Sequence, residues 1–200
     1  ACALPVSEPD PPAPLELSFS PDWYRQEIKN GMFRIADGVL YGSGYNLYGV
    51  LGNDSPANPL PTDGGQYYEN IVITRDAVHV TGGSTAVAYI DTNGDLYGLG
   101  DNANGLMREE MTPDQRMNSC LYLVTSPRLL MEGVLYASMS GGHILVIKRD
   151  HSLWAWGANM NGALGDGSQG TEVPYGTTYE TSPYSAQPIH IMDDVVYAHA

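Results

Sequence analysis

The chain has 200 residues, of which 42% are hydrophobic and 16% are charged, which excludes a highly charged disordered chain and a coiled coil. It carries 9 Lys and Arg against 23 Asp and Glu, a formal net charge of −14, and this shortage of cations argues strongly against a broad basic surface for nucleic acid. No aliphatic run is long enough to cross a bilayer. The 23 Gly and 14 Tyr, beside only 2 Phe, indicate tight turns and strands.

The first 18 residues differ from the rest, because prolines crowd the segment from 5 to 14. Such a segment favours an extended, polyproline-like tether outside the folded unit. Cys2 lies beside the chain start, after the small residue Ala1. One interpretation is the lipid-bearing cysteine of a bacterial surface lipoprotein, and the other is an unmodified thiol in a tail. With Cys120 as the only other cysteine, the chain has no disulfide framework and no structural zinc site made of thiols.

The folded unit is expected over residues 19–200. A short helix is the first element expected in it, from Trp23 to Lys29, although its caps are poor. From there on, three segments align without gaps: 38–52, 94–107 and 151–165, with starts 56 and 57 residues apart. The similarity continues upstream, where 76–90 aligns with 133–147 and a further copy begins at 194, 61 residues later. The longer last spacing has its source in a Gly-, Thr-, Tyr- and Pro-rich loop, 167–187.

Each copy is expected to form strands, because short runs rich in Val, Leu and Tyr alternate with turn residues. Asn93-Gly94 predicts a hairpin with a two-residue type I′ turn, which requires positive φ at both positions. Asp37-Gly38 and Asp150-His151 occupy the same place in the other copies, so the last hairpin must accept a non-glycine residue there.

A repeat of 56–61 residues made of short strands predicts an all-β fold of β-propeller blades, here about three of them. Recurrent residues have expected structural roles. The glycines should sit where packing or a positive φ excludes a Cβ atom, and the asparagines should bond the blade backbone. These residues are Gly44, Gly100, Gly157, Asn46, Asn102 and Asn159.

The repeats resemble the repeat family of the regulator of chromosome condensation over about residues 33–200. Residues 133–167 match best, with His143 at the turn, then Trp156-Gly157-Ala158-Asn159 and Leu164-Gly165. The other copies depart from this pattern, since Ser43 and Leu99 replace the tryptophan. The resemblance implies a structural role for His143.

Family members are typically seven-bladed, so the resemblance implies that the remaining blades come from the same or another chain. The founding eukaryotic member is a nucleotide exchange factor on chromatin, a role that the charge of −14 argues against. A bacterial secreted branch, which includes a propeller-type β-lactamase inhibitor, is more similar, and the acidic charge, the many tyrosines and the N-terminal segment of this chain suit the extracellular or cell-surface location that this resemblance implies.

No pattern indicates catalysis, a cofactor or a metal. Asp91, Asn93 and Asp95 resemble the start of a calcium loop, but the position that needs glutamate is Asn102, and a hairpin explains them equally well. The five histidines lack metal-binding spacing.

Tyrosines in the connecting segments are the candidate binding residues, because tyrosine combines a large contact area with a polar tip. The leading hypothesis is a non-enzymatic extracellular propeller that binds a protein, selecting a basic face with its acidic surface. One alternative is a carbohydrate-binding or carbohydrate-active module in which Trp154, Trp156 or loop tyrosines stack on sugars. Another is a structural blade array of a larger cell-surface protein. The candidate tyrosines are Tyr45, Tyr48, Tyr67, Tyr68, Tyr175, Tyr179 and Tyr184.

Overall fold

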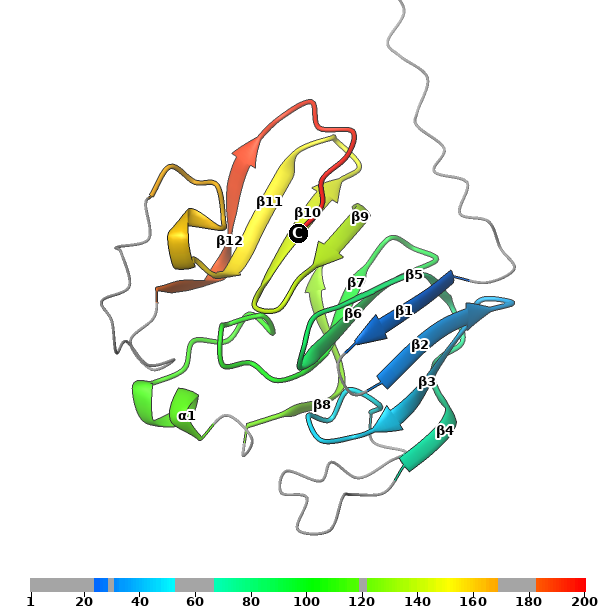
Figure 1. Cartoon of the computed structure of the whole chain (residues 1–200). Helices are drawn as coiled ribbons and strands as arrows, with labels where there is room; N and C mark the ends of the chain where they lie inside the picture. The colour runs from blue at the N-terminus through cyan, green and yellow to red at the C-terminus, as the bar shows by residue number, and fades with distance from the viewer. Residues whose placement is uncertain (1–23, 29–30, 53–66, 119–121, 169–182) are drawn as a thin grey trace, which may run out of the picture.

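The computed structural model describes residues 24–28, 31–52, 67–118, 122–168 and 183–200. In these residues the fold is all-β apart from short helical turns, and its strands form three four-stranded antiparallel sheets (Figure 1). In each sheet the strands lie side by side in chain order. The expected partial β-propeller is therefore confirmed, with each repeat forming one sheet, or blade.

The strands of the three blades have the following bounds. Blade 1 contains β1 (Tyr24–Ile28), β2 (Gly31–Ala36), β3 (Val39–Tyr45) and β4 (Tyr67–Thr74). Blade 2 contains β5 (Ala77–Gly82), β6 (Ala86–Asp91), β7 (Leu96–Gly100) and β8 (Val124–Met131), with helix α1 (Pro113–Met117) between β7 and β8. Blade 3 contains β9 (Val134–Met139), β10 (His143–Lys148), β11 (Leu153–Ala158) and β12 (Tyr184–Met192), with a 3₁₀ turn at Met160–Gly162.

The helix expected over Trp23 to Lys29 is wrong, because residues 24–28 form β1. This strand pairs antiparallel with β2, Gln26 lying opposite Phe33. A helix of seven residues is too short to be stable without tertiary packing, whereas antiparallel pairing with β2 gives alternate residues of the same segment backbone hydrogen-bond partners. With β1 included, blade 1 has the same four strands as the other two.

The three predicted hairpins are present, but their turns differ. Asp37 and Gly38 both have positive φ, 52° and 76°, as a two-residue type I′ turn requires. In blade 2 only Gly94 has positive φ, and its N–H donates to the carbonyl of Asp91 at 3.0 Å. The two-residue turn predicted at Asn93-Gly94 is therefore wrong, and a four-residue connection takes its place. His151 adopts the left-handed position in blade 3, with φ of 64°.

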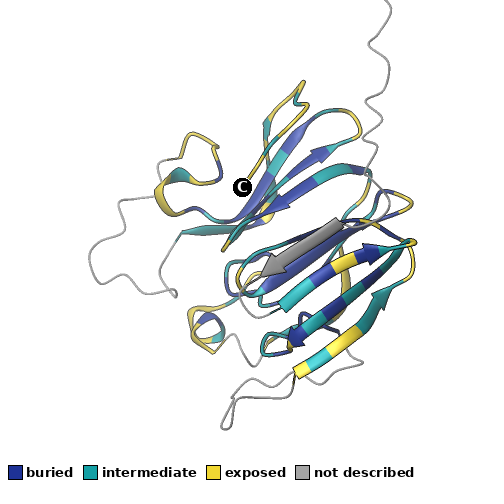
Figure 2. Ribbon diagram, turned by 45° about the vertical axis from the view of Figure 1, so that its right-hand side comes forward, coloured by how far each residue is buried: buried dark blue, intermediate teal, exposed yellow. Residues whose placement is uncertain are grey.

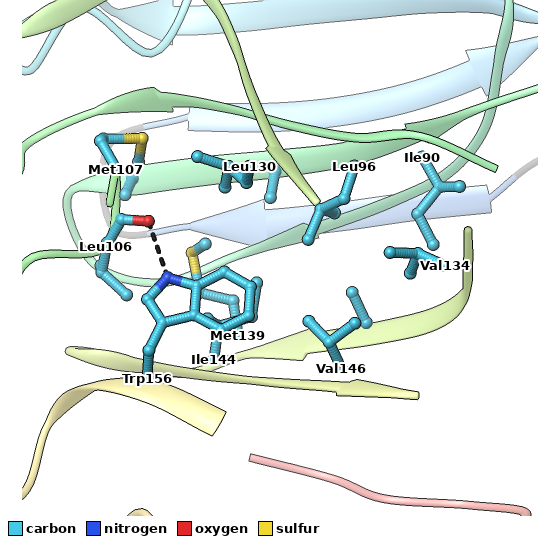
Figure 3. Close-up of a cluster of buried hydrophobic side chains, with 13 residues drawn as sticks. Ile90, Leu96, Leu106, Met107, Leu130, Val134, Met139, Ile144, Val146 and Trp156 are labelled. Carbon is cyan, nitrogen blue, oxygen red and sulfur yellow. Dashed lines mark hydrogen bonds between the residues drawn. The ribbon is translucent and has the colours of Figure 1, made fainter. Parts of the chain in front are cut away.

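Hydrophobic cores lie between consecutive blades. Each blade has a leading face toward the preceding blade and a trailing face toward the following one. The core between blades 2 and 3 joins the trailing-face side chains of Ile90, Leu96 and Met107 to the leading-face side chains of Ile144 and Trp156 (Figure 3). The Trp156 side chain is fully buried, and its Nε1–H donates to the carbonyl of Leu106 at 3.0 Å. This hydrogen bond fixes blade 3 against the loop that follows β7.

Burial differs between the central blade and the end blades (Figure 2). All six residues of β6 are buried, because blades 1 and 3 cover both faces of blade 2. In β2 the buried residues are Phe33 and Ile35, which face blade 2. The outer strands β4 and β8 are mostly exposed or half-buried. One blade alone therefore leaves apolar positions open, and its neighbours bury them.

One backbone hydrogen bond recurs at every blade boundary. The N–H of Ala77 donates to the carbonyl of Gly38 at 2.8 Å, and the N–H of Val134 donates to that of Gly94 at 2.7 Å. The third copy runs from the N–H of Val195 to the carbonyl of His151 at 2.9 Å. The first strand of each blade is thus tied to the second hairpin of the blade before it, and β5 packs between β1 and β9.

Several expectations fall outside the described residues: the proline-rich tether of residues 1–18, the environment of Cys2, and most of the lengthened loop 167–187. Within the described part of the chain, no helix is long and apolar enough to span a membrane.

Candidate functional site

The long connections of the three blades leave the sheets at one edge (Figure 1). In each blade the third and fourth strands are joined by the longest segment: 46–66, 101–123 and 159–183. Because every blade repeats the same antiparallel order, the third strand always ends at the same edge of its sheet. We call the surface formed by the described parts of these segments (46–52, 101–118, 122–123, 159–168 and 183) the loop face.

Asparagine side chains fix the start of each segment. The side-chain oxygen of Asn46 accepts the N–H of Leu51 at 2.9 Å. Asn102 accepts that of Met107 at 2.7 Å, and Asn159 accepts that of Leu164 at 3.1 Å. All three asparagines are buried, where an unpaired backbone N–H would be costly. The aligned asparagines therefore hold one loop geometry in three blades.

The aligned glycines precede these asparagines and share an unusual backbone conformation. Gly44, Gly100 and Gly157 have φ of 133°, 115° and 108°, where residues with side chains are rarely found. A Cβ atom on Gly100 would lie 2.5 Å from the carbonyl oxygen of Thr85. On Gly157 it would lie 2.7 Å from the Cα of His143. Both the φ angle and the neighbouring strand thus exclude a side chain at these ends of β7 and β11.

The connection of blade 2 folds into helix α1, which the sequence reading missed. Thr112 caps it: its hydroxyl accepts the N–H of Gln115, and the Gln115 side chain accepts the N–H of Thr112. This reciprocal arrangement is a capping box, followed by Pro113 at the first helical position. The signal was present in the sequence as Thr-Pro-Asp-Gln. The helix displays Met117, whose side chain is 61% exposed.

Tyr184 joins the loops of blades 2 and 3. Its hydroxyl donates to the Glu110 carboxylate at 2.8 Å, and its ring lies 4.3 Å from the guanidinium carbon of Arg116. Arg116 is buried on α1, and its Nε–H donates to the carbonyl of Ala103 at 2.7 Å. Burial raises the pKa of the Tyr184 hydroxyl above its ordinary value. Tyr184 is therefore held inside the loop face, with its polar tip engaged by the protein itself.

Two candidate tyrosines form an exposed pair on blade 1. The rings of Tyr45 and Tyr67 meet edge to face with centroids 5.4 Å apart, and their side chains are 38% and 51% exposed. Tyr48 and Tyr68 are half-buried and pack against the core between blades 1 and 2. The structure thus brings Tyr45 and Tyr67 together at the surface and draws Tyr48 and Tyr68 inward. Tyr175 and Tyr179 lie outside the described residues.

A small pocket with a volume of about 160 Å³ opens on the loop face of blade 2. Glu109 and Glu110 contribute carboxylates, and Arg128 pairs with Glu109 at 2.6 Å. Tyr122, which is 47% exposed, lines the same pocket. Sequence reasoning missed Tyr122 as well, because nothing in its local pattern separates it from an ordinary strand tyrosine. The pocket places an exposed aromatic ring beside negative charge.

The arrangement of three blades can now be compared with known proteins. No family model matches the chain. Among solved structures, human WBSCR16 matches with a TM-score of 0.59 at 16% identity. Yeast RCC1 (Prp20) bound to Kap60 matches with 0.60 at 16% identity, and Prp20p from Saccharomyces cerevisiae with 0.61 at 18% identity. Each match covers 86% of this chain.

The chain has the fold of the RCC1-type β-propellers. It spans 37–38% of the length of these three structures, so the structural similarity covers only part of each of those proteins. Sequence identities of 16–18% together with the structural match show a shared fold. They do not show that this chain has the activity of those proteins.

Two histidines of these RCC1-type blades, His79 and His143, lie in strands and are buried and half-buried, respectively. His79 on β5 is buried, and its Nε2–H donates to the carbonyl of Ala137 on β9 at 2.7 Å. Burial lowers the pKa of His79, although this hydrogen bond acts in the opposite direction. His143 is half-buried at the start of β10, and burial lowers its pKa too. In the described part of the chain, no group of three or more His, Cys, Asp or Glu is arranged to hold a metal ion.

The acidic cluster of blade 2 caps its hairpin. One oxygen of the Asp91 carboxylate accepts the N–H of Asn93 at 2.9 Å and that of Asp95 at 2.8 Å. The other Asp91 oxygen accepts the side-chain amide of Asn93 at 3.3 Å. Since both oxygens bond groups of their own turn, the hairpin accounts for this cluster.

The tryptophans proposed for sugar stacking are placed unfavourably. Trp156 is fully buried between blades 2 and 3, so stacking of a saccharide on Trp156 is wrong. Trp154 is half-buried, and its Nε1–H donates to the Ser152 hydroxyl at 2.8 Å.

Proposed function

We propose that this RCC1-type chain is a non-enzymatic binding propeller that holds a protein partner against its loop face. The exposed Tyr45–Tyr67 pair is the observation that carries the proposal. Met117 and Tyr122 extend the exposed apolar groups across the loops of blade 2. Aromatic and methionine side chains are enriched at protein interfaces and supply most of the binding free energy there.

Charge supports a partner with a basic face. The chain has a net charge of −14, and the loop face of blade 2 carries Glu109, Glu110 and Asp114. Complementary charge speeds the encounter of two proteins and selects among partners more than it strengthens the final complex. We therefore expect the association rate to fall as salt rises, with a smaller change in the dissociation rate.

The comparisons are consistent with binding of proteins. One match is the structure of yeast RCC1 (Prp20) bound to Kap60, and the description of the other Prp20p structure names binding to Gsp1p and histones. Those partners belong to those proteins. For this chain they support only the general idea that an RCC1-type propeller surface engages another protein.

We place the protein outside the cell or on a bacterial surface, with Cys2 as a lipid attachment site. This proposal rests on Cys2 and on the prolines that follow it, which provide a spacer between a membrane and the blades. Labelling of the producing cells with a fatty-acid analogue tests it. The wild-type chain should take up label, and the Cys2→Ser variant should not. Equal labelling of both, or none in the wild type, contradicts the lipid attachment.

Binding is tested by capture of surface proteins of the producing organism on the immobilised chain, quantified by mass spectrometry. Tyr67→Ala combined with Tyr122→Ala should reduce retention of the specifically captured protein at least tenfold, since interface aromatics commonly contribute about 2 kcal/mol each. Met192→Ala is the matched control, because Met192 is equally exposed, at 53%, but lies at the opposite end of blade 3. Equal retention by the double variant and the control contradicts the assignment of the loop face.

A glycan array separates this function from the carbohydrate-binding alternative. The protein-binding proposal predicts no saccharide signal above that of the Tyr67→Ala variant. If the wild-type chain binds a saccharide and the Tyr67→Ala variant does not, the exposed tyrosines bind a sugar and the protein-binding proposal is contradicted.

A further inference from the structure

The pocket on the loop face of blade 2 is about the size of one side chain. Its described lining residues lie between Asn102 and Arg128, so they all come from blade 2. Its volume of about 160 Å³ is that of about five water molecules in the liquid, whereas pockets for drug-sized ligands measure about 300 Å³ or more. The pocket therefore admits the end of a single side chain of a partner protein.

Part of the lining of this pocket is apolar. Met111, Leu123 and Val124 line it, and all three are half-buried. Tyr122 adds an aromatic ring that is 47% exposed. The long side chain of a lysine lays its aliphatic stem along apolar groups of this kind while its charged end stays among polar groups. The lining thus suits a side chain that is apolar along its length and polar at its end.

The acidic part of the lining consists of two carboxylates, each engaged through one oxygen. Oε2 of Glu109 accepts the Nη1–H of Arg128 at 2.6 Å, and Oε2 of Glu110 accepts the hydroxyl of Tyr184 at 2.8 Å. The other oxygen of each carboxylate has no hydrogen-bond partner in the described part of the chain. No described ion pair includes Glu110, so its negative charge is available to a cation from outside.

The two available oxygens favour an ammonium group over a guanidinium group. Arginine binds a carboxylate best in the bidentate mode, which needs both oxygens of the same carboxylate. Glu109 and Glu110 each offer only one. An ammonium group carries three donors on a flexible stem, so it can bond single oxygens of two different carboxylates. The face of an aromatic ring such as that of Tyr122 attracts a cation as well.

Arg128 shows how a cation of the chain itself is held at this pocket. Its Nη1–H donates to Glu109 and also to the carbonyl of Met107 at 3.3 Å. Its side chain is 42% exposed, so the pairing is made in contact with solvent. Arg128 therefore competes with an incoming cation for Glu109 but leaves Glu110 to it.

We propose that this pocket holds one lysine side chain of the protein partner. The aliphatic stem lies against Met111 and the ring of Tyr122, and the ammonium group bonds the available oxygens of Glu109 and Glu110. This proposal rests on the proposed binding function of the loop face and names the residue type that the pocket recognises on the basic partner. The net charge of −14 attracts the partner, and the pocket selects one lysine on it.

Titration with a small probe tests the pocket without the partner. Nα-acetyl-L-lysine amide is added to the 200-residue chain, and the ring signals of Tyr122 are followed by NMR. We expect a saturable shift of these signals and weaker binding of Nα-acetyl-L-arginine amide. The Nε-acetylated form of the lysine probe, which carries no charge, should bind about tenfold more weakly, because it loses an exposed cation–π contact and an exposed ion pair.

Three variants make the result specific. Glu110→Gln keeps an oxygen for the Tyr184 hydroxyl but removes the charge, so affinity for the lysine probe should fall about threefold. Arg128→Gln removes the competing cation from Glu109, and affinity should rise about twofold. Glu132→Gln is the matched control, because Glu132 is an exposed carboxylate just beyond the other end of β8, and it should leave the affinity unchanged.

Several results overturn the lysine pocket: no shift of the Tyr122 signals, equal binding of the uncharged probe, tighter binding of the arginine probe, or an equal loss of affinity in Glu132→Gln. Failure of the wider function gives a different pattern, in which the lysine probe binds but the loop face captures no protein. If the chain captures a protein through Tyr67 and the lysine probe does not bind, the lysine pocket is wrong and the binding function stands.

Discussion

Equivalent positions in the blades are similar at the interfaces between blades but differ on the loop face. At the interfaces, equivalent positions keep the same character: Leu40 and Leu96 occupy one position in blades 1 and 2, and both are fully buried in the cores between blades. On the loop face, the three connections diverge into a tyrosine pair in blade 1, helix α1 in blade 2 and a 3₁₀ turn in blade 3. The aligned glycines and asparagines, which we call the anchors, lie where each third strand passes into its loop. The loops therefore differ among the blades while the sheets stay alike.

The largest effect is expected at an anchor glycine. Gly157→Val places a branched side chain at a φ of 108° and against the backbone of the neighbouring strand. Backbone strain and overpacking together should cost on the order of 5 kcal/mol of unfolding free energy. Urea denaturation measures it, and Gly167→Val is the control, since no atom lies within 4 Å of a Cβ there although φ is also positive, 78°. If the variant melts at the same temperature as the wild type, glycine is not required at position 157 and the proposed role of Gly157 is wrong.

The interface between blades 2 and 3 comes next. Trp156→Ala removes a fully buried indole and its hydrogen bond to Leu106, which should cost about 3–5 kcal/mol. Trp154→Ala, in the same strand but half-buried, should cost clearly less. The two variants are compared by thermal and urea unfolding. Equal losses would show that the blade interface is no more sensitive than the half-exposed face of the same strand.

A loop anchor should have an intermediate effect. Asn102→Ala leaves the buried N–H of Met107 and the carbonyl of Glu109 without their partner, at a cost of about 1–3 kcal/mol. Asn118→Ala, which removes an exposed bond to the carbonyl of Asp114, is the control and should change stability by less than about 0.5 kcal/mol. Because Asn102 lines the pocket with Glu109, its replacement should also weaken binding at the loop face, whereas Asn118→Ala should not.

Acidification is expected to weaken the contact between blades 2 and 3 through His79. Burial lowers the pKa of His79 in the folded chain below the ordinary 6.5, so the unfolded chain takes up the proton first as pH falls. Stability is therefore complete above about pH 7 and declines below 6.5, by at most about 1.4 kcal/mol per pH unit for one group. Urea midpoints between pH 5 and 8 measure this, and His79→Gln should flatten the slope. His143, which is half-buried and also has a lowered pKa, contributes in the same direction and remains in that variant.

The smallest effect on stability is expected on the loop face itself. Tyr67→Ala removes a side chain that is 51% exposed and touches Tyr45 at its edge. Exposed substitutions of this kind usually change stability by less than about 0.5 kcal/mol. Calorimetry on the variant should give a nearly unchanged melting temperature alongside its reduced capture of a partner. A large loss of stability would instead show that Tyr67 stabilises the fold of blade 1.

The blade architecture could be predicted from the sequence because its signals repeat. Three copies of one pattern of leucine, glycine and asparagine define the strand order before any single element is certain. The first strand of blade 1 was mistaken for a helix because residues 24–28 lie ahead of the first recognisable copy. Residues 24–28 form a strand because they pair with β2. The local sequence does not show which segment they pair with.

The candidate site was less accessible to sequence reasoning. Clustering of tyrosines directs attention to the long connections, but burial decides which of the described tyrosines face outward. Tyr184 is turned inward by Arg116, a residue 68 positions earlier in the chain. Tyr122 and Glu110 line one pocket although helix α1 lies between them in the chain, and no local sequence pattern shows that proximity.

The bond that joins each first strand to the preceding hairpin has a consequence for how such proteins change over generations. Gly38, Gly94 and His151 offer the same carbonyl to Ala77, Val134 and Val195, so blades 2 and 3 each carry both halves of the connection. A gene duplication that copies one whole repeat delivers a unit whose two ends already match its neighbours. At this backbone hydrogen bond, neither junction of the copied repeat needs a compensating mutation, because a carbonyl and an N–H are present whatever the side chain.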